Sequence, residues 1–329
     1  MDVYRGQKVL ITGGLGFIGS NLAIRLVGLG ASVTLLDSLH PTCGGNYFNV
    51  ESIRKDVEII EGDAADLALV RRIIRQKHYV FNLAGHVSHI ESMEDPFSDL
   101  HMNALAPLAI LEACKHENRN AHVVYSGTRQ SYGRPESVPL VETQIPKPLD
   151  VNGVTKLAGE GFHMVYNRAY GIPAVSLRLV NTYGPRQLVK HPRQGFVGWF
   201  IKQVIDGEEI ELYGDGQQLR GFNYIDDVVE ALLIAGINKQ LIGDYFNLGG
   251  ERPLTLEAFV QLLIKVAGQG SYRLVPFPSD KKAIDIGSVY TSAAKFREAA
   301  GWEAKVTLEE GLKRTVEYYK QHRENYWGV

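Results

Sequence analysis

The chain has 329 residues, 45% of them hydrophobic, which is enough to bury the core of one large α/β unit or of two modest domains. Its formal net charge of −2 argues against nucleic acid or an acidic membrane surface as a partner. The two cysteines cannot build a disulfide framework and are not spaced as metal ligands. No signal peptide and no run of about 18 apolar residues is visible, so we expect a cytoplasmic protein without a metal or a membrane span.

The first predicted elements are a strand, a glycine turn and a helix, within KVLITGGLGFIGSNL at residues 8–22. In this segment Gly13, Gly16 and Gly19 fit the spacing GxxGxxG. Such glycines let the backbone turn tightly and approach a pyrophosphate, to which the helix N-terminus offers free N–H groups. The next predicted strand ends in Asp37, about 20 residues downstream, where a carboxylate can accept hydrogen bonds from the adenosine ribose. Because that carboxylate would repel a 2′-phosphate, the pattern favours NAD over NADP.

Strand and helix signals then alternate through the first half of the chain. The predicted strands are residues 32–36, 57–61, 79–83, 121–126 and 174–179, and the predicted helices are residues 67–74, 95–114 and 154–170. This alternation predicts an α/β fold with a doubly wound parallel sheet of the Rossmann type. In such a sheet the ligand lies beyond the carboxyl ends of the strands, so the loops at 84–92, 127–133 and 181–195 are expected to form the site.

After about residue 181 the loops lengthen and contain more proline and glycine. Further helices are predicted at residues 196–205, 226–235, 256–266 and 308–322, and a short strand at 209–213. We therefore predict an NAD-binding domain over residues 1–180 and a smaller, mixed α/β substrate-binding lobe that makes up most of residues 181–329. Segments within about 220–250 are expected to return to the first domain.

Eight motifs then follow one another along the chain. They are GGLGFIGS, GDAAD, NLAG, SGTRQSYG, GVTKLAGE, NTYGPRQ, LYGDGQQLRGFNYIDD and FNLGG. With these motifs, residues 8–318 resemble the extended short-chain dehydrogenase/reductase family, in its nucleotide-sugar epimerase and dehydratase branch (UDP-glucose 4-epimerase-like). The resemblance implies NAD as the cofactor, a nucleoside-diphosphate sugar as the substrate, and a homodimer formed through the helices that start near Asp95 and Val154.

The resemblance also implies which residues bind NAD. It gives the pyrophosphate to Gly13, Gly16, Phe17 and Ile18, the adenosine ribose to Asp37, the adenine to Asp63 and Ala64, the nicotinamide side to Leu83, Ala84 and Gly85, and the nicotinamide ribose to Lys156.

For the substrate, the resemblance implies that Thr128 contacts the reacting sugar hydroxyl. The other implied substrate contacts are Ser88, Arg129, Gln130, Asn181, Arg186, Val197, Tyr213, Arg220 and Lys282. A diphosphate needs fixed cations, and guanidinium groups can bind phosphate oxygens bidentately. Because Arg186, Arg193 and Arg220 lie in glycine- or proline-rich loops, a phosphate-binding role is favoured over that of ordinary surface arginines.

One departure from the family pattern decides the mechanism. The family places Tyr-x-x-x-Lys on one helix face, where the lysine charge lowers the phenol pKa and the tyrosinate takes a proton from a sugar hydroxyl. Here Asn152 stands four residues before Lys156, and an amide has no acid or base function near neutral pH.

Four explanations for Asn152 are open. His86, or less favourably His89, replaces the tyrosine, because histidine titrates in the right range. Alternatively, Lys156 or Thr128 carries the proton through water. The asparagine could also have been introduced to trap a substrate. In the fourth, the protein binds both ligands but turns over poorly, because general acid–base help contributes only about 10²–10⁴-fold.

A second departure concerns the reaction. Family 4,6-dehydratases carry Asp-Glu directly after the catalytic threonine, whereas this chain has Arg129 and Gln130, so dehydration is disfavoured. The segment at residues 194–200 is also similar to the family's 2-epimerases of cytidine-diphospho sugars. The leading hypothesis is an NAD-dependent nucleotide-sugar epimerase acting at C4 through a transient keto-sugar. The alternatives are a C2 epimerase of a nucleotide-linked deoxysugar, a nucleotide-sugar dehydrogenase or reductase, and a catalytically weak binding protein.

Overall fold

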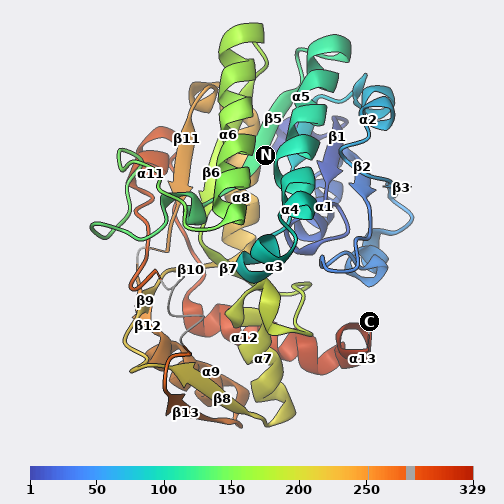
Figure 1. The fold of residues 1–329 in the computed structure, drawn as a ribbon. Coiled ribbons are helices and arrows are strands. Elements are labelled where there is room, and N and C mark those ends of the chain that lie inside the picture. Colours follow the sequence, from blue (N-terminus) through green and yellow to red (C-terminus); the bar gives the residue numbers. More distant parts are fainter. Residues whose placement is uncertain (251, 279–285, 329) are drawn as a thin grey trace.

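The computed structural model describes residues 1–250, 252–278 and 286–328, and within them seven parallel strands form one sheet (Figure 1). The strand order is β11-β6-β5-β4-β1-β2-β3. These strands are β1 (Lys8–Thr12), β2 (Ser32–Asp37), β3 (Val57–Glu61), β4 (Tyr79–Asn82), β5 (His122–Thr128), β6 (Ala174–Leu179) and β11 (Tyr245–Leu248). The predicted doubly wound parallel sheet is therefore confirmed. Its order reverses between β1 and β4, the kind of switch point beside which open α/β sheets bind ligands.

Helices cover both faces of this sheet because its strands are apolar on both sides. In β1, Val9 and Ile11 face one core and Leu10 faces the other, as the period of two in a strand requires. The first core is closed by α1 (Phe17–Gly28) and α8 (Ile225–Ile237). The second is closed by α2 (Leu67–Ile74), α5 (Ala106–Glu117) and α6 (Val151–Tyr170), of which α5 and α6 lie side by side in Figure 1.

The second lobe lies below the sheet in Figure 1 and faces the carboxyl ends of its strands. Its helices are α7 (Phe196–Asp206), α9 (Leu256–Ala267), α12 (Leu308–Gln321) and α13 (Arg323–Trp327). Helix α11 (Ala294–Ala300) lies instead beside the edge strand β11 of the sheet (Figure 1). Its strands form three pairs: β7 (Asn181–Tyr183) with β10 (Phe222–Tyr224), β8 (Glu209–Tyr213) with β13 (Ser271–Val275), and β9 (Leu219–Arg220) with β12 (Leu254–Thr255).

The helix predicted over residues 95–114 is interrupted, which corrects the prediction. It consists of α4 (Pro96–Leu100), a π-helical turn (His101–Leu105) and α5, and it is preceded by a short helix, α3 (His89–Glu94), that was not predicted. The physical cause is Pro107, which has no N–H and whose ring clashes with the carbonyl four residues earlier, that of Asn103. The turn aims the Asn103 side chain at the loop after β4.

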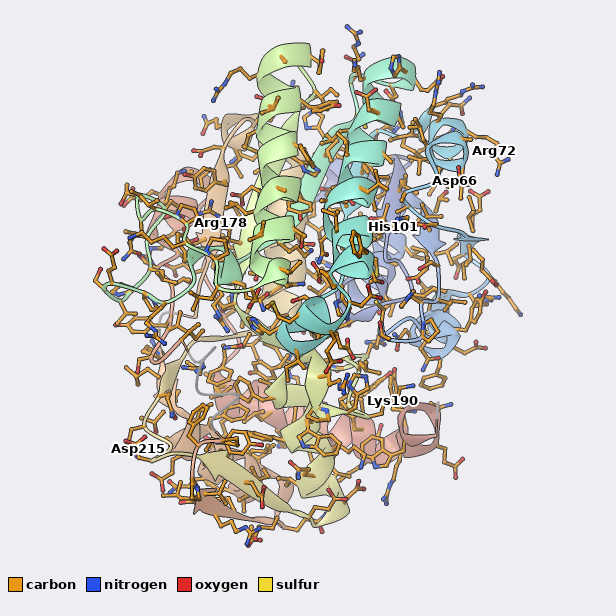
Figure 2. All side chains as sticks on the ribbon, in the orientation of Figure 1. Asp66, Arg72, His101, Arg178, Lys190 and Asp215 are labelled. Atoms are coloured by element: carbon orange, nitrogen blue, oxygen red, sulfur yellow. The ribbon has the colours of Figure 1, made fainter. Side chains whose placement is uncertain are left out.

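A buried ion pair ties α6 to the sheet. Arg178 of β6, labelled in Figure 2, meets Glu160 of α6 with 2.5 Å between Nη2 and Oε1. Its Nη1 donates to the hydroxyl of Tyr132 at 2.6 Å, in the 3-10 turn (Arg129–Tyr132) that follows β5. This network fixes the turn directly after Thr128.

Among the described residues, no helix is both long and apolar enough to cross a membrane.

Candidate active site

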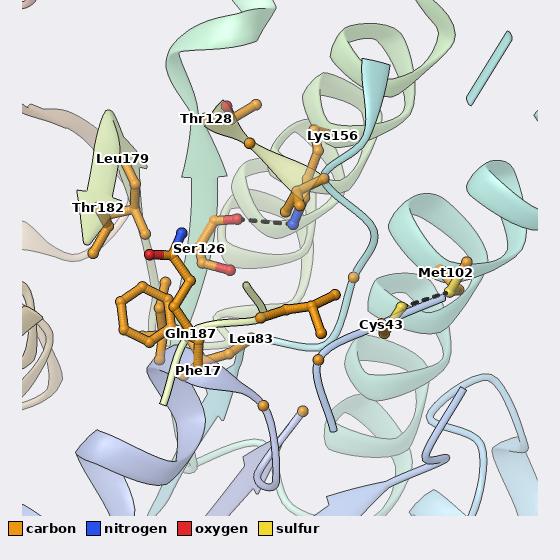
Figure 3. Close-up of a pocket in the computed structure, with 18 of the residues that line it drawn as sticks. Phe17, Cys43, Leu83, Met102, Ser126, Thr128, Lys156, Leu179, Thr182 and Gln187 are labelled. Carbon is orange, nitrogen blue, oxygen red and sulfur yellow. Dashed lines mark hydrogen bonds between the residues drawn. The ribbon is translucent and has the colours of Figure 1, made fainter. Parts of the chain in front are cut away.

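A cavity of about 610 Å³ lies between the carboxyl ends of the central strands and the second lobe (Figure 3). A cavity of this size is typical of small-molecule and cofactor sites. All residues that the sequence assigns to NAD line it, as do Thr128, Arg129, Gln130, Asn181, Val197, Tyr213 and Arg220 from the expected substrate contacts. Residues far apart in the sequence therefore meet in one chamber.

The glycine turn after β1 packs closely against neighbouring backbone because Gly13, Gly16 and Gly19 carry no side chain. Gly13 has a φ of +67°, and a Cβ there would lie 3.0 Å from the backbone nitrogen of Ala84. A Cβ at Gly16 would lie 3.2 Å from the carbonyl oxygen of Gly13, and one at Gly19 would overlap that oxygen. These glycines thus let the turn, helix α1 and the neighbouring strand end approach one another closely. The N-terminus of α1 then lies at the cavity, where a dinucleotide pyrophosphate fits.

The two carboxylates expected at the adenosine end lie where the motif requires. Asp37, at the end of β2, accepts hydrogen bonds from the backbone N–H groups of Leu15 and Leu39, both at 2.9 Å, and burial raises its pKa. Burial would also raise the pKa of Asp63, but hydrogen bonds from Ala65 N–H and His101 lower it. Both carboxylates line the cavity and can accept hydrogen bonds from an adenosine.

Thr12, which is buried behind the glycine turn, joins the ends of β1 and β4. Its hydroxyl accepts from the N–H groups of Leu83 and Ala84 at 3.1 and 3.0 Å and donates to the side-chain oxygen of Asn82 at 3.0 Å. This bond network holds Ala84 against Gly13, where the two motifs form one wall.

Lys156, the residue expected at the nicotinamide ribose, projects from α6 into the cavity (Figure 3). Its Nζ donates to the carbonyl oxygen of Ser126 at 3.2 Å and lies 5.3 Å from the ring centroid of Tyr125. Burial lowers its pKa to about 8, although the charge of Asp99 acts in the opposite direction. Thr128, at the end of β5, lines the same wall and caps the following turn through the N–H of Gln130.

Asn152, at the tyrosine position, does not line the cavity. Its side chain is fully buried, and its Nδ2 donates to the carbonyl oxygen of His86 at 2.8 Å and to Oδ2 of Asp99 at 2.9 Å. Its Oδ1 is buried without a hydrogen-bond partner among the described residues. The amide therefore connects α6 to the loop after β4 and to Asp99 of α4, and it does not reach the cavity.

His86, the favoured replacement for the tyrosine, is also outside the cavity, so the expectation that it faces the sugar is corrected. Its Nδ1 lies 3.3 Å from Oδ2 of Asp99 and its Nε2 lies 2.6 Å from Oε2 of Glu91. Burial opposes the charged ring, but these two carboxylates raise its pKa. Both ring nitrogens thus contact carboxylates. The side chain of Asn103, in the π-helical turn, also accepts from the N–H of His86 and donates to its carbonyl oxygen.

Two other expected substrate contacts have structural partners instead. Ser88 is buried and caps α3 by accepting from the N–H of Glu91 at 3.2 Å. Arg186 donates to the carbonyl oxygen of Asn49 and to Oδ1 of Asn21, both at 3.0 Å. Neither residue lines the cavity, whereas Arg193 does; Lys282 lies outside the described residues.

His89 is the residue that sequence reasoning undervalued. It begins α3, lines the cavity, and places its Nδ1 against Oδ2 of Asp150 and its Nε2 against the side-chain nitrogen of Gln130. Asp150 was not predicted to take part, although its place just before α6 is a common N-cap position and the structure confirms a cap. The sequence shows a histidine on the loop after β4 and an aspartate before a helix, but only the fold shows that the two side chains meet.

The turn after β5 and the second lobe together contribute cations to the cavity, and the second lobe adds aromatic rings. Arg129 and Arg220 both line it, and burial together with the charge of Arg220 lowers the pKa of Arg129 to about 9. Tyr213 and Phe277 pair with 5.6 Å between ring centroids. This end of the cavity therefore offers two neighbouring positive charges beside an aromatic surface.

Residues 9–249 match the model of the NAD dependent epimerase/dehydratase family. The chain is 29% identical over 316 residues to UDP-glucose 4-epimerase of Mycolicibacterium smegmatis, covering 95% of this chain and 99% of that protein. The solved UDP-glucose 4-epimerase of Thermotoga maritima, with UDP-glucose, has a TM-score of 0.86 and 32% identity, covering 96% of this chain and 100% of that chain.

A third protein, dTDP-glucose 4,6-dehydratase from Streptomyces venezuelae solved with NAD bound, has a TM-score of 0.87 and 25% identity, covering 98% of this chain and 99% of that chain. The match of the family model over most of the chain agrees with the glycine turn, the two adenosine-side carboxylates and the buried lysine. The chain belongs to the NAD-dependent epimerase/dehydratase family of nucleotide-sugar enzymes, and NAD is its cofactor.

Proposed function

We propose that this protein is a nucleotide-sugar epimerase that inverts C4 of a nucleoside-diphosphate hexose through a transient keto-sugar. The observation that carries the proposal is one cavity, whose lining includes the dinucleotide-binding turn, Thr128, Lys156 and the two cations Arg129 and Arg220. A sugar bound between these groups lies beside the position expected for the nicotinamide.

When bound, NAD would supply a hydride acceptor that is regenerated within each turnover. Gly13 and Gly16 would hold its pyrophosphate, Asp37 and Asp63 its adenosine, and Lys156 its second ribose. The lysine ammonium would also favour negative charge developing on a nearby sugar oxygen. Thr128 would orient the reacting hydroxyl from the end of β5.

The diphosphate would bind where Arg129 and Arg220 bring two positive charges together. Burial and the nearby charge of Arg220 lower the pKa of the Arg129 guanidinium, and an anion bound beside it would favour its charged form. Tyr213 and Phe277 would cover the nucleobase with their rings. Asn181, whose Nδ2 donates to the carbonyl oxygen of Gly221 at 2.8 Å, and Val197 of α7 would complete this wall.

The residues after Thr128 favour epimerisation over dehydration. Arg129 and Gln130 line the cavity where a dehydratase needs an acid–base pair, and neither can serve as one. C2 epimerisation is the second candidate, favoured by the segment of residues 194–200, from which Val197 reaches the cavity. A dehydrogenase or reductase would differ from an epimerase because it would cause net reduction or oxidation of NAD. A binding protein with weak catalysis is favoured only by Asn152.

The test of the proposed function is turnover of a substrate panel. The purified protein with its NAD is incubated with UDP-, GDP-, CDP- and dTDP-hexoses, and the products are identified by NMR. We expect one hexose to equilibrate with its C4 epimer without accumulation of reduced cofactor. Inversion at C2, stoichiometric reduction of the cofactor, or binding without turnover would each replace the proposal by one of the alternatives.

We also propose that two copies of the chain associate through α4, α5 and α6. Apolar side chains are exposed along this face: Phe97 is 82% exposed, and Leu105, Val154 and Val165 are each about half exposed. Leu111 of α5, by contrast, packs into the second core. Sedimentation of the wild type should give a dimer, and Phe97→Glu with Leu105→Glu should give a monomer. A monomeric wild type would contradict this assembly.

A further inference from the structure

A chain of four side chains runs along the cavity wall from α6 to β5. Asp150 Oδ2 contacts Nδ1 of His89, and Nε2 of His89 contacts the side-chain nitrogen of Gln130. The side-chain oxygen of Gln130 accepts a hydrogen bond from the hydroxyl of Thr128 at 3.2 Å. The imidazole is therefore separated by one glutamine side chain from the hydroxyl expected to contact the reacting sugar.

The first two members of this chain are held by separate helices. Asp150 is buried and caps α6, because its Oδ1 accepts from the N–H of Gly153 at 2.7 Å while its Oδ2 remains for His89. His89 begins α3, and its side chain is 37% exposed, on the cavity side. The carboxylate is thus fixed, and the ring that it orients is accessible from the cavity.

This arrangement determines which nitrogen of His89 can accept a proton. A carboxylate only accepts hydrogen bonds, so the neutral ring carries its proton on Nδ1, facing Asp150. Nε2 then has a free electron pair, to which the Gln130 amide donates in this structure. A sugar hydroxyl could donate to the same electron pair once Gln130 turns aside. A histidine oriented in this way by a carboxylate is suited to general base and acid catalysis.

We propose that His89, oriented by Asp150, takes and returns the proton of the reacting sugar hydroxyl, in the place of the tyrosine that Asn152 replaces. This inference rests on the proposed function. As the sugar carbon is oxidised, its O–H bond breaks and an Nε2–H bond forms on His89, while the C–H electron pair leaves as the hydride that the bound NAD accepts. When the ketone is reduced, the proton and the hydride both return, so the histidine and the cofactor end each turnover as they began.

The neighbouring titratable groups are less suited to this step. His86 has both ring nitrogens against carboxylates and lies outside the cavity. Asn152 has no proton to exchange near neutral pH and faces Asp99. His89 is thus the histidine, among the residues described here, that lines the cavity.

The first experiment compares His89→Ala and His89→Gln with the wild type on a hexose that the wild type epimerises. Both variants should lose at least about 100-fold in kcat while KM stays within about threefold. Added imidazole should restore about tenfold or more in His89→Ala, whose cavity can accept it, and nothing in His89→Gln. The matched control, His116→Gln on the outer part of α5, should keep wild-type rates.

The second experiment does not depend on turnover. With ¹⁵N-labelled histidine, NMR should show neutral His89 protonated on Nδ1, the signal being assigned by its loss in His89→Gln. In Asp150→Asn, which keeps a residue able to cap α6, the amide donates to Nδ1 and should move the ring proton to Nε2. This variant should fold normally and lose kcat by about the same factor as His89→Gln.

The outcomes separate this inference from the proposed function. If the wild type inverts a sugar and the kcat of His89→Ala stays within about threefold of the wild-type kcat, the proposed role of His89 and Asp150 is rejected. The proposed epimerase function is then retained. The same holds if neutral His89 carries its proton on Nε2 in the wild type. If the wild type inverts no sugar in the panel, both proposals are rejected.

Discussion

Asn152 is a structural residue in this account, because its amide fills a position that no phenol could fill with the same hydrogen bonds. Its Nδ2 joins the carbonyl oxygen of His86 to the buried carboxylate of Asp99, which Thr155 also contacts. A tyrosine there would leave both acceptors without this donor and would have to enter a closed space. In this account the residue at the tyrosine position, Asn152, is structural, and proton transfer is assigned to another residue, His89.

Asn152→Tyr should therefore not increase turnover. We expect the free energy of unfolding to fall by about 2–4 kcal/mol, from overpacking and from the orphaned acceptors, as measured by urea unfolding. Arg168→Tyr, on the exposed side of the same helix, is the control and should change stability by about 0.5 kcal/mol or less. A gain of about tenfold or more in kcat for Asn152→Tyr would show that the asparagine only weakens the enzyme.

Lys156 costs stability in the free protein because its ammonium is buried. Its pKa of about 8 lies below the ordinary value near 10.4, so the unfolded chain binds more protons between these pH values. The contribution of Lys156 to stability is unfavourable below pH 8 and improves as the pH rises toward about 10.4. The cost at pH 7 is about 3 kcal/mol at most.

Lys156→Met should accordingly be more stable than the wild type at pH 7, by about 1–3 kcal/mol in urea unfolding of the cofactor-free proteins. The difference should shrink as the pH is raised from 7 to 10. The same variant should bind NAD more weakly. If Lys156→Met is less stable at pH 7, or if the difference does not depend on pH, the buried charge does not carry this cost.

At the scale of the elements, the glycine turn and helix α1 form one packed unit. A Cβ at Gly19 would overlap the carbonyl oxygen of Gly13 and lie 2.9 Å from the Cα of Gly14. By contrast, a Cβ at Gly28, at the end of the same helix, would meet nothing within 4 Å. Two glycines of one helix thus have opposite requirements.

Gly19→Ala should lower the free energy of unfolding by about 2–3 kcal/mol and remove NAD from the purified protein. Its matched control, Gly28→Ala, should keep NAD and gain up to about 1 kcal/mol, because alanine favours the helical backbone. Thermal unfolding and the ultraviolet absorbance of released NAD measure the two effects. Equal behaviour of the two variants would contradict the packing described for the turn.

The elements of the first half could be predicted because their signals are local. Apolar runs and glycine spacing placed β1 to β6 within two residues, and the helical period placed most helices. The interruption in the helix predicted over residues 95–114 was missed because it depends on Pro107 together with the contacts of Asn103 with a distant loop. The pairing of His89 with Asp150 was missed because it joins residues 61 positions apart.

At the scale of the whole molecule, the two lobes supply different halves of one chamber. The sheet contributes the cofactor wall, and the second lobe contributes Arg220, Tyr213 and Asn181. The sequence motifs identified most of these residues, but side-chain direction decided which of them face the chamber. Arg186 turns to Asn49 and Asn21 instead, although it lies in a matching motif.

The paired arginines predict a trade between stability and binding. Arg129→Met removes one of two repelling charges, so the free protein should keep its stability or gain up to about 1 kcal/mol. The Kd for a nucleoside diphosphate, measured by calorimetry, should rise by about 10- to 100-fold, because a charge-assisted hydrogen bond is lost. Arg72→Met, on the exposed side of α2, should change neither quantity. Unchanged affinity in Arg129→Met would move the diphosphate away from this end of the cavity.

The central claim is that the hydrogen of one sugar carbon leaves and returns within a single chamber. The most direct measurement uses the nucleotide hexose that the protein accepts, labelled with deuterium at C4 and incubated with the enzyme in ordinary water. The account predicts the C4 epimer with the deuterium retained at C4, and no accumulation of reduced cofactor. Loss of the deuterium to water would contradict this account. Inversion of a ring carbon other than C4, or recovery of the starting sugar unchanged, would contradict it as well.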